Sequence, residues 1–399
     1  MIWQQRMQRL ASHLRQHSPL PARLVWDGQA IDFGLFEQPL VTMHIRKPAG
    51  LRYLLSPRLD HLGEAYVRGL VDIEGKLDDI IDMAHALARR GKRYPLQRLA
   101  GVLFSHNRRA DRQAIQYHYD VSNHFYAQWL DPEMVYSCAY FPQGDETLAA
   151  AQIKKIDHIL TKVKLQNGHT LLDIGCGWGA LLIRAARQFD VKCLGITLSQ
   201  QQYAEATRRV SLAGLQDRVE IRLMDYRDLT GRFDRITSVG MFEHVGVKGL
   251  PGYFRQILNL LTPDGLALNH GITSVSTNQR DAPFGAGNFI DKFVFPGGQL
   301  PHIGTTLSTM QQGGLEGLDV ENLRRHYALT LSLWSQNYES NSMRIRQEIG
   351  EERYRIWRIY LAGCAHAFRN DVISVYQILC QPAGRHADTL AWSRQYMYG

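Results

Sequence analysis

The chain of 399 residues is 45% hydrophobic and 10% aromatic, which excludes a disordered polymer and allows two domains with buried cores. Its net charge of +8 favours an anionic partner, either nucleic acid or a membrane surface. Five cysteines without CxxC spacing argue against disulfides and a zinc site, so we expect no metal and a reducing cytoplasm.

The first 88 residues predict a small N-terminal α+β domain whose detailed fold the sequence leaves open. Residues 3–16 have apolar side chains at helical spacing, which fits a basic helix lying on a membrane or a helix packed on its own domain. Short β-like pieces follow in ARLVWDG, LVTMHIRKP and LRYLLS. The stretches LDHLGEAYVRG and KLDDIIDMAHALARR then predict helices.

Residues 89–114 read as a basic linker, because Gly91 and Pro95 interrupt any regular pattern. Between Arg89 and Arg112 there are eight basic residues and a single acid, Asp111. Such a cluster favours an anionic membrane surface, while a merely solvated linker remains the alternative for any one arginine. No stacking motif for nucleic acid accompanies it, so we expect no nucleic-acid partner.

From about residue 145 helices alternate with short apolar strands. The expected order is helix 147–163, strand TLLDIG, helix 179–189, strand VKCLGIT, helix 200–213, then strands RVEIRLMD and FDRITSVG. This alternation predicts an α/β fold with a doubly wound, mostly parallel sheet covered by helices on both faces.

A glycine-rich loop lies where the first of these strands meets its helix. The glycines allow a ligand to approach the backbone where a Cβ would clash. The spacing Gly175-x-Gly177-x-Gly179 differs from the GxGxxG of dinucleotide sites, and Asp173 precedes the first glycine. The second strand ends in GITLS, which lacks the acid that would bind a dinucleotide ribose.

Several further motifs occur in a fixed order along the chain. They are QYHYDVSN at 116–123, FYAQWLDPEMVYSCAYF at 125–141, GMFEHVG at 240–246, LNHGI at 268–272, NFIDKFVFPGG at 288–298 and HYALTL at 326–331. Together with the glycine loop they resemble the cyclopropane fatty acid and mycolic acid cyclopropane synthases, over roughly residues 115–385. These enzymes are a branch of the class I S-adenosylmethionine (SAM)-dependent methyltransferases.

The resemblance implies a catalytic domain at 115–399 with a seven-stranded, mostly parallel Rossmann-like sheet. It implies transfer of a methylene from SAM to the cis double bond of an unsaturated acyl chain in a membrane phospholipid. A carbocation on the chain would then lose a proton to a bound bicarbonate. The bicarbonate site implied by the family consists of Cys138, Glu243, His270, the backbone of Ile272, and Tyr327.

Carried over residue by residue, the resemblance also implies the SAM contacts. They are Tyr136, Ser137, Asp173, Gly175, Cys176, Gly177, Trp178, Gly179, Thr197, Leu198, Ser199, Gln202, Tyr226 and Arg227. Each candidate has a simpler alternative, such as an ion pair for Glu243, a core position for His270 or helix packing for Tyr327. His124 departs from the Asp that many relatives have at this position, which leaves a local contact in doubt.

The chemistry requires an apolar pocket that excludes water and places aromatic faces near a cation. Candidate rings are Tyr136, Tyr140, Phe141, Phe289, Phe293 and Phe295, and any of them could instead be core. Rival functions are a methyl-branched or methylene fatty acyl product, N-methylation of a small amine, and non-catalytic lipid binding. We expect peripheral association with the inner face of the cell membrane, and the resemblance allows a homodimer.

Overall fold

The computed structural model describes residues 20–55, 58–90, 122–277, 286–295, 298–384 and 390–398, together with residues 5, 8, 9, 11, 12 and 15. The predicted helix at 3–16 is therefore described only in part. The linker beyond Arg90 and the motif at 116–121 lie outside the described residues. The chain divides into two compact units, which are described separately below.

The first unit contains a four-stranded sheet in the order β2-β1-β3-β4. Its strands are β1 (Ala22–Trp26), β2 (Gln29–Asp32), β3 (Val41–Ile45) and β4 (Val71–Gly75). Its helices are α2 (Gly50–Leu55), α3 (Leu59–Val67) and α4 (Leu77–Arg90). Strands β1 and β3 run parallel, and the other two pairs are antiparallel. A core that includes Leu24, Phe33 and Leu51 fills the space between sheet and helices.

One sequence prediction in this unit is wrong, because LRYLLS forms helix α2 and not a strand. Leu51, Tyr53 and Leu54 are buried and Arg52 is exposed, which is not the strict alternation of a half-buried strand. A short apolar run does not distinguish the two structures by itself. The pieces at β1 and β3 are confirmed as strands, and the two predicted helices are confirmed as α3 and α4.

The first unit is assembled from segments far apart in sequence. Besides the N-terminal region it includes α11 (Ala286–Phe293) and residues 338–366, which hold most of α14 (Ser342–Arg369). The Phe289 ring lies where a Cβ on Gly63 of α3 would be 2.8 Å from Cδ2. Arg358 of α14 donates to the Tyr66 hydroxyl at 2.9 Å. The first compact unit thus takes segments from both sides of residue 115, and the domain limits expected from the sequence stay a prediction.

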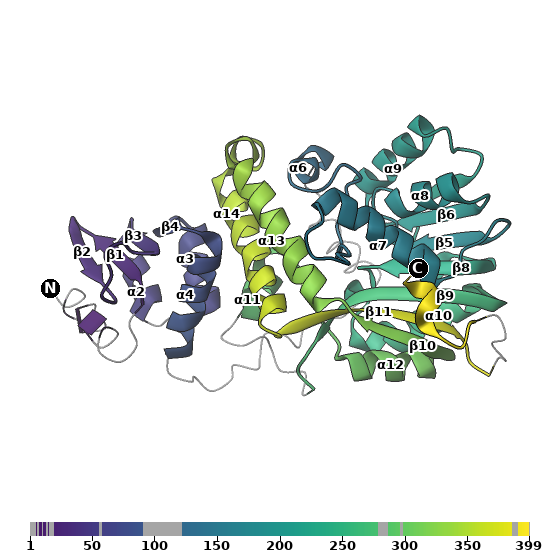
Figure 1. Cartoon of the computed structure of the whole chain (residues 1–399). Helices are drawn as coiled ribbons and strands as arrows, with labels where there is room; N and C mark the ends of the chain where they lie inside the picture. The colour runs from purple at the N-terminus through teal and green to yellow at the C-terminus, as the bar shows by residue number, and fades with distance from the viewer. Residues whose placement is uncertain are drawn as a thin grey trace. The chain divides into compact units, whose positions relative to one another are not determined.

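The second unit contains the predicted seven-stranded sheet, in the order β10-β11-β9-β8-β5-β6-β7 (Figure 1). Its strands are β5 (Thr170–Ile174), β6 (Lys192–Thr197), β7 (Val219–Leu223), β8 (Phe233–Val239), β9 (Leu261–Ser274), β10 (Leu315–Asn322) and β11 (Ile373–Pro382). The neighbouring strands β7, β6, β5, β8 and β9 are parallel. Strand β11 pairs antiparallel with both β9 and β10. The mostly parallel sheet is thus confirmed.

Helices cover both faces of this sheet (Figure 1). Helices α7 (Leu148–Lys162), α8 (Ala180–Gln188) and α9 (Gln200–Leu212) share one core with the sheet, and α10 (Leu250–Leu260) and α12 (Ile303–Gln312) share the opposite core. The short α6 (Asn123–Ala127) precedes α7, and α13 (Arg324–Ser340) follows β10. Residue parity along β9 separates the faces, because Leu266 and Leu268 belong to the first core and Ala267 to the second.

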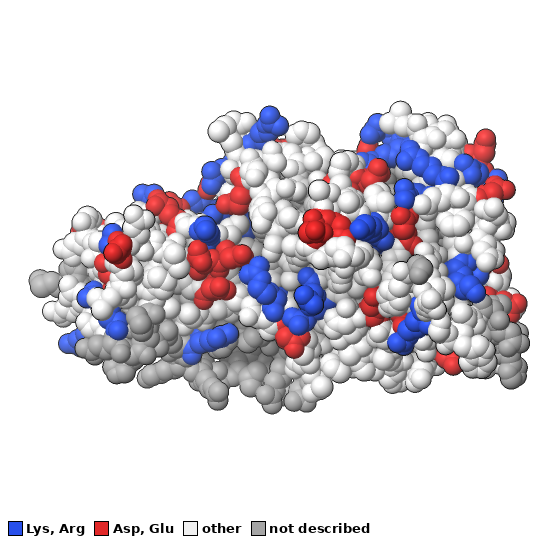
Figure 2. All heavy atoms as spheres, in the orientation of Figure 1, with Lys and Arg blue, Asp and Glu red and all other residues white. Residues whose placement is uncertain are grey.

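On the face drawn in Figure 2, Lys and Arg are interspersed with Asp and Glu. No helix among the described residues is long and apolar enough to cross a membrane.

Candidate active site

The glycine loop turns sharply between β5 and α8. Gly175, Gly177 and Gly179 all have positive φ, at 82°, 55° and 86°, which other residues adopt only with strain. The Gly175 and Cys176 amides both donate to the Ile196 carbonyl at 3.0 Å, so β6 fixes the start of the loop. Apart from Gly177 itself and its two chain neighbours, no heavy atom of the described residues lies within 4 Å of the Cβ position at Gly177. The backbone at Gly177 therefore borders open space, whereas a Cβ at Gly175 or Gly179 would lie 3.2 Å from Met241 or 3.4 Å from Ala206.

Asp173 lies at the end of β5 with its carboxylate fully inside the protein. It is 3% exposed, and its Oδ1 accepts a hydrogen bond from the Thr237 hydroxyl at 2.8 Å. Burial raises its pKa to about 6, opposed by the Thr237 hydrogen bond and by the charge of Lys155. Asp173 is therefore a buried acid that one hydroxyl and one cation keep available as an anion.

The loop after β6 is organised by its own side chains. The Thr197 hydroxyl donates to Gln202 Oε1 at 2.8 Å and accepts from the Ser199 amide at 3.1 Å. Ser199 caps α9 by accepting from the Gln202 amide at 3.3 Å. Leu198 between them is half-buried. These four predicted SAM contacts form one connected turn at the carboxyl end of the sheet.

After β7, Asp225 holds the next predicted contacts. Its carboxylate accepts from the Arg227 backbone amide at 2.9 Å and from two nitrogens of the Arg227 guanidinium, at 2.9 and 2.7 Å. The guanidinium also lies 5.5 Å from the Tyr226 ring centre. The pair is therefore rigid, and Tyr226 stands edge-on to the buried Tyr253.

Trp178 of the glycine loop connects to α6. Its Nε1 donates to Asn123 Oδ1 at 2.8 Å, and Asn123 Nδ2 donates to the Gln201 carbonyl at 3.3 Å. Asn123 therefore joins the loop to the start of α9. Trp129 contacts the rings of Tyr126, Tyr136 and Trp334, whose centres lie 5.4–5.8 Å from its own. Tyr136 thus faces an aromatic wall.

Cys138 is completely buried, in a segment held by α13. Its Sγ lies 3.8 Å from the Leu323 carbonyl, which also accepts from the Tyr327 amide at 3.0 Å. Burial raises the pKa of the thiol, so it stays neutral at physiological pH. The Tyr327 ring is half-buried between Trp334 and Phe368. The Cys138 thiol and the backbone amide of Tyr327 thus contact the same carbonyl.

Glu243 continues the β8–β9 ladder after β8 has ended. The Gly240 amide donates to the His270 carbonyl at 2.8 Å, and Glu243 Oε1 accepts from the Ile272 amide at 2.7 Å. The other oxygen, Oε2, is buried and has no hydrogen-bond partner among the described residues. Burial raises the pKa of Glu243 to about 7, against the lowering effect of the Ile272 amide.

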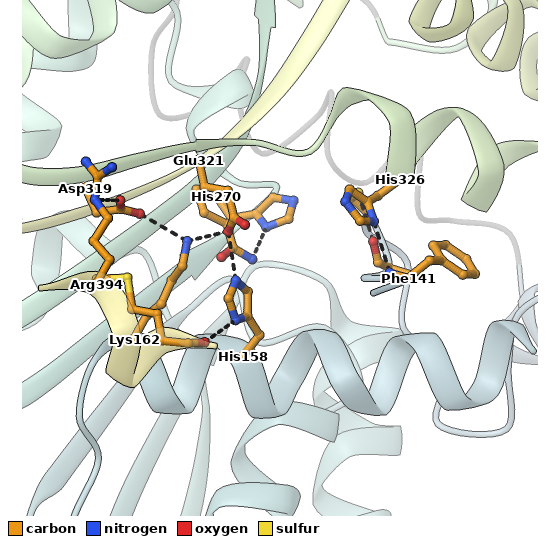
Figure 3. Close-up of polar contacts among 12 residues, drawn as sticks. Phe141, His158, Lys162, His270, Asp319, Glu321, His326 and Arg394 are labelled. Carbon is orange, nitrogen blue, oxygen red and sulfur yellow. Dashed lines mark hydrogen bonds and ion pairs between the residues drawn. The ribbon is translucent and has the colours of Figure 1, made fainter. Parts of the chain in front are cut away.

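His270 lies on the same face of β9 as Ile272, two residues before it. Its Nδ1 is 3.2 Å from the Gln377 amide nitrogen, which can only donate, so Nδ1 accepts and Nε2 carries the proton (Figure 3). Nε2 is buried without a partner among the described residues. Burial, reinforced by the charges of Lys155 and Lys162, lowers the pKa of His270 well below its usual range. His270 is therefore a neutral donor.

A buried ionic network lies beside this group (Figure 3). Lys162, 0% exposed, contacts Glu321 Oε2 at 2.6 Å and Asp319 Oδ2 at 3.3 Å. His158 Nε2 is 2.8 Å from the same Glu321 oxygen, and Arg394 contacts Asp319 Oδ1 at 2.8 Å. The C-terminal segment thereby helps to neutralise a buried cluster on the sheet.

Three predicted pocket rings belong to the first unit. Phe289 is 6% exposed and packs with Val67, Val294 and Ile356, while Phe293 and Phe295 border this cluster. The packing of these three rings is that of core residues, which was the alternative to a pocket-lining role. Tyr140 lies in the second unit and stacks on His158 at 4.3 Å, and the neighbouring Phe141 amide donates to His326 Nδ1 at 3.0 Å (Figure 3).

Two residues beside the predicted site were not expected from the sequence. Gln377 orients His270, and Lys155 donates to the Ser137 hydroxyl at 2.8 Å. Gln377 lies on a strand far along the chain, so only the pairing of β11 with β9 places it there. Lys155 lies on the helix predicted at 147–163 and is buried there. Lysine is rarely buried, so a lysine on the core-facing side of this helix was the signal that could have identified it.

The sheet order, the glycine loop and the acid beneath it define a class I SAM-dependent methyltransferase fold. Residues 106–378 match the family described as mycolic acid cyclopropane synthetase. The chain therefore belongs to this family and is a SAM-dependent methyltransferase of the cyclopropane synthase type. Residues 11–91 match a separate domain of unknown function, DUF7884.

Named relatives agree with this assignment. The chain is 44% identical over 389 residues to a probable fatty acid methyltransferase from Pseudomonas putida, covering 96% of this chain and 97% of that protein. It is 38% identical to cyclopropane mycolic acid synthase 1 of Mycobacterium tuberculosis over 67% of this chain and 96% of the relative. The crystal structure of mycolic acid cyclopropane synthase CmaA1 complexed with SAH and CTAB superposes with a TM-score of 0.65 at 38% identity, over 68% of this chain and 98% of that one.

Proposed function

We propose that this protein converts cis-unsaturated acyl chains of membrane phospholipids into cyclopropane acyl chains. One observation carries the proposal: in a chain of this family, Glu243 Oε2 and His270 Nε2 are buried polar atoms without partners among the described residues. Unpaired polar atoms are costly inside a protein, so two of them at the carboxyl end of the sheet favour a bound polar group. The full-length relationship to a probable fatty acid methyltransferase supports an acyl substrate.

Bound SAM would supply an electrophilic methyl group on a sulfonium. The alkene carbon forms a bond to that methyl while the carbon–sulfur bond breaks, which leaves a carbocation on the acyl chain. Loss of a proton from the transferred methyl then closes the ring, and the proton needs a base. The protein must exclude water throughout, because water would capture the cation.

The residues present fit a bicarbonate base. The Nε2–H of His270 can donate to an anion, and Glu243 can accept the bicarbonate proton. Cys138, the Ile272 backbone and Tyr327 are the other residues that would hold it. Since the Cys138 thiol is buried and neutral, it suits a lining role and not that of a nucleophile.

A methyl-branched or methylene product is the second candidate. The observation that favours it is the name of the full-length relative, which specifies fatty acid methylation and not ring formation. Both candidates share the first methyl transfer. A methylene product would form if a hydride shift along the chain preceded loss of the methyl proton, and a saturated methyl branch would need a hydride donor in addition.

Expression in a bacterium without such lipids, followed by mass spectrometry of its fatty acids, tests the proposal. We expect a gain of one CH2 with loss of the double bond and no methyl branch. A branched or methylene product would refute ring formation while leaving lipid methylation intact. The Glu243→Gln variant is the negative control. Removing dissolved carbon dioxide should slow the purified enzyme, and added bicarbonate should restore it.

We further propose peripheral association with the anionic inner face of the cell membrane. The excess of Lys and Arg between Arg89 and Arg112 supports it, since each such residue near an anionic bilayer contributes about 1 kcal/mol. Cosedimentation with vesicles containing anionic lipid should fall steeply with salt. Equal binding to neutral vesicles would contradict this. The homodimer stays a prediction that light scattering can measure.

A further inference from the structure

One face of α7 holds the segment that contains Ser137. Gln152 Nε2 donates to the carbonyls of Val135 and Ser137 at 3.2 and 2.9 Å. Lys155, three residues along and therefore on the same face, donates to Ser137 Oγ at 2.8 Å. Both the backbone and the hydroxyl of Ser137 are thus fixed by this helix.

Lys155 is a buried cation with unused hydrogen-bonding capacity. It is 2% exposed, and an ammonium has three donors. Among the residues that the structure describes, Ser137 is its sole hydrogen-bond partner and no carboxylate forms an ion pair with it within 4.0 Å. Asp173 and Asp131 nevertheless lie close enough for their charges to act on it. A buried charge without direct neutralisation favours an anionic ligand.

The contact also fixes the direction of the Ser137 hydroxyl. Because an ammonium only donates, Ser137 Oγ accepts from Lys155 and its own hydrogen remains available to another acceptor. Donation from a cation also polarises the hydroxyl and strengthens the next hydrogen bond in the chain. Ser137 is therefore prepared to donate to an anion.

We propose that Lys155 and Asp173 form a charge pair that recognises the zwitterionic amino-acid end of SAM. Asp173 faces the ammonium, and Lys155 acts on the carboxylate through the Ser137 hydroxyl, as a positioning residue. The two charges come from different elements, Asp173 from β5 and Lys155 from α7, and each acts on the pKa of the other. This inference rests on the proposed function, because it deepens the assignment of the same SAM site.

Calorimetry with SAM and with decarboxylated SAM tests the inference, because the two ligands differ by the carboxylate alone. We expect Lys155→Met to weaken SAM binding roughly 10- to 100-fold, the range for a lost hydrogen bond to a charged group. Binding of decarboxylated SAM should change less than about threefold. The ratio of the two affinities is independent of the folded fraction, so a loss of stability cannot imitate this result.

Two further variants complete the design. Ser137→Ala should lower the same ratio, and the double variant should lower it no further, because both residues act on one carboxylate. Lys154→Met is the matched control, since Lys154 is the neighbouring lysine of α7 and pairs with Glu146 at the surface. Its ratio should equal that of the wild type.

Equal weakening of both ligands by Lys155→Met would overturn the inference and make Lys155 a structural residue. Unchanged binding of both ligands would overturn it as well. Failure of the wild-type protein to bind SAM at all would instead refute the proposed function, and the inference with it. The product analysis by mass spectrometry is independent of these ratios.

Discussion

Glu243 has two carboxylate oxygens in different situations, one bound to the Ile272 amide and one buried without a described partner. Gln in its place keeps an oxygen for the amide but loses the ability to accept a proton. We expect Glu243→Gln to lower turnover roughly 100-fold or more, the usual cost of removing an acid–base group. SAM affinity, measured by calorimetry, should remain nearly unchanged. Full activity in this variant would exclude Glu243 from the proton pathway.

Glu243→Gln should lower turnover but raise the stability of the folded protein. The pKa of Glu243 is raised from 4.5 to about 7 in the folded protein, so the folded state binds the proton more tightly. The stability from this group is present below pH 4.5 and is lost as pH rises through 7. We therefore expect Glu243→Gln to stabilise the protein by about 1–3 kcal/mol at pH 8 and little at pH 4.5. Denaturant unfolding at the two pH values measures it, and a pH-independent difference would contradict the assignment.

At the scale of elements, the close approach of Phe242 to β9 positions Glu243. A Cβ at Gly271 would overlap the Phe242 ring, so β9 has a glycine where the ring packs. Gly271→Ala should therefore displace Phe242 and the adjoining Glu243, with a loss of stability of about 1–3 kcal/mol and a larger loss of turnover. Adding Phe242→Leu should recover part of the stability. No recovery would mean that the ring is not the obstacle.

The buried network around Lys162 allows a second prediction at this scale. Lys162→Met removes a fully buried cation from two carboxylates, and we expect a loss of about 3 kcal/mol. Arg394→Ala should cost at most about 1 kcal/mol, because its side chain is 64% exposed. Urea unfolding followed by tryptophan fluorescence compares the variants. Similar losses in both would show that the surface arginine and the buried lysine share the charge equally.

The sequence predicted the elements whose pattern is local. The helices and strands from α7 to β8 alternate clearly, and positive φ at the three glycines follows from their residue type. The strand predicted for LRYLLS is wrong, because the side chains that this short run buries depend on what packs against it. Gln377 and Lys155 could not be placed, since one requires the pairing of distant strands and the other the facing of α7 toward Ser137. The contact of Glu243 with Ile272 could not be predicted either, because it depends on how β8 and β9 pair and on where that pairing stops.

At the scale of the whole molecule, the first unit is built from segments that are far apart in the sequence, and this determines how a shortened chain should behave. Val67 packs with Phe289, Val294 and Ile356, and Arg355 of α14 contacts Asp72 at 2.6 Å. A chain that begins at residue 115 would leave these surfaces of α11 and α14 uncovered. We expect it to aggregate or to lose several degrees in its thermal midpoint relative to the full chain, although the mycobacterial relative matches only 67% of this chain. A soluble monomer of full stability, measured by light scattering and calorimetry, would contradict this.

The interleaved order of segments in the first unit also governs how the protein is made. Its β-sheet and α3 leave the ribosome early, but α14, whose Ile356 packs with Val67 of α3, ends at Arg369, about 279 residues after Arg90. At the usual ~5–20 residues per second of translation, that interval lasts roughly 15–55 seconds. During this time Val67 at the end of α3 lacks its partners in α11 and α14, while Ala65 of the same helix packs in the core of the N-terminal sheet. Nascent chains of this protein can therefore form the core between the N-terminal sheet and its helices early, whereas the cluster around Val67 is completed only after α14 has been synthesised.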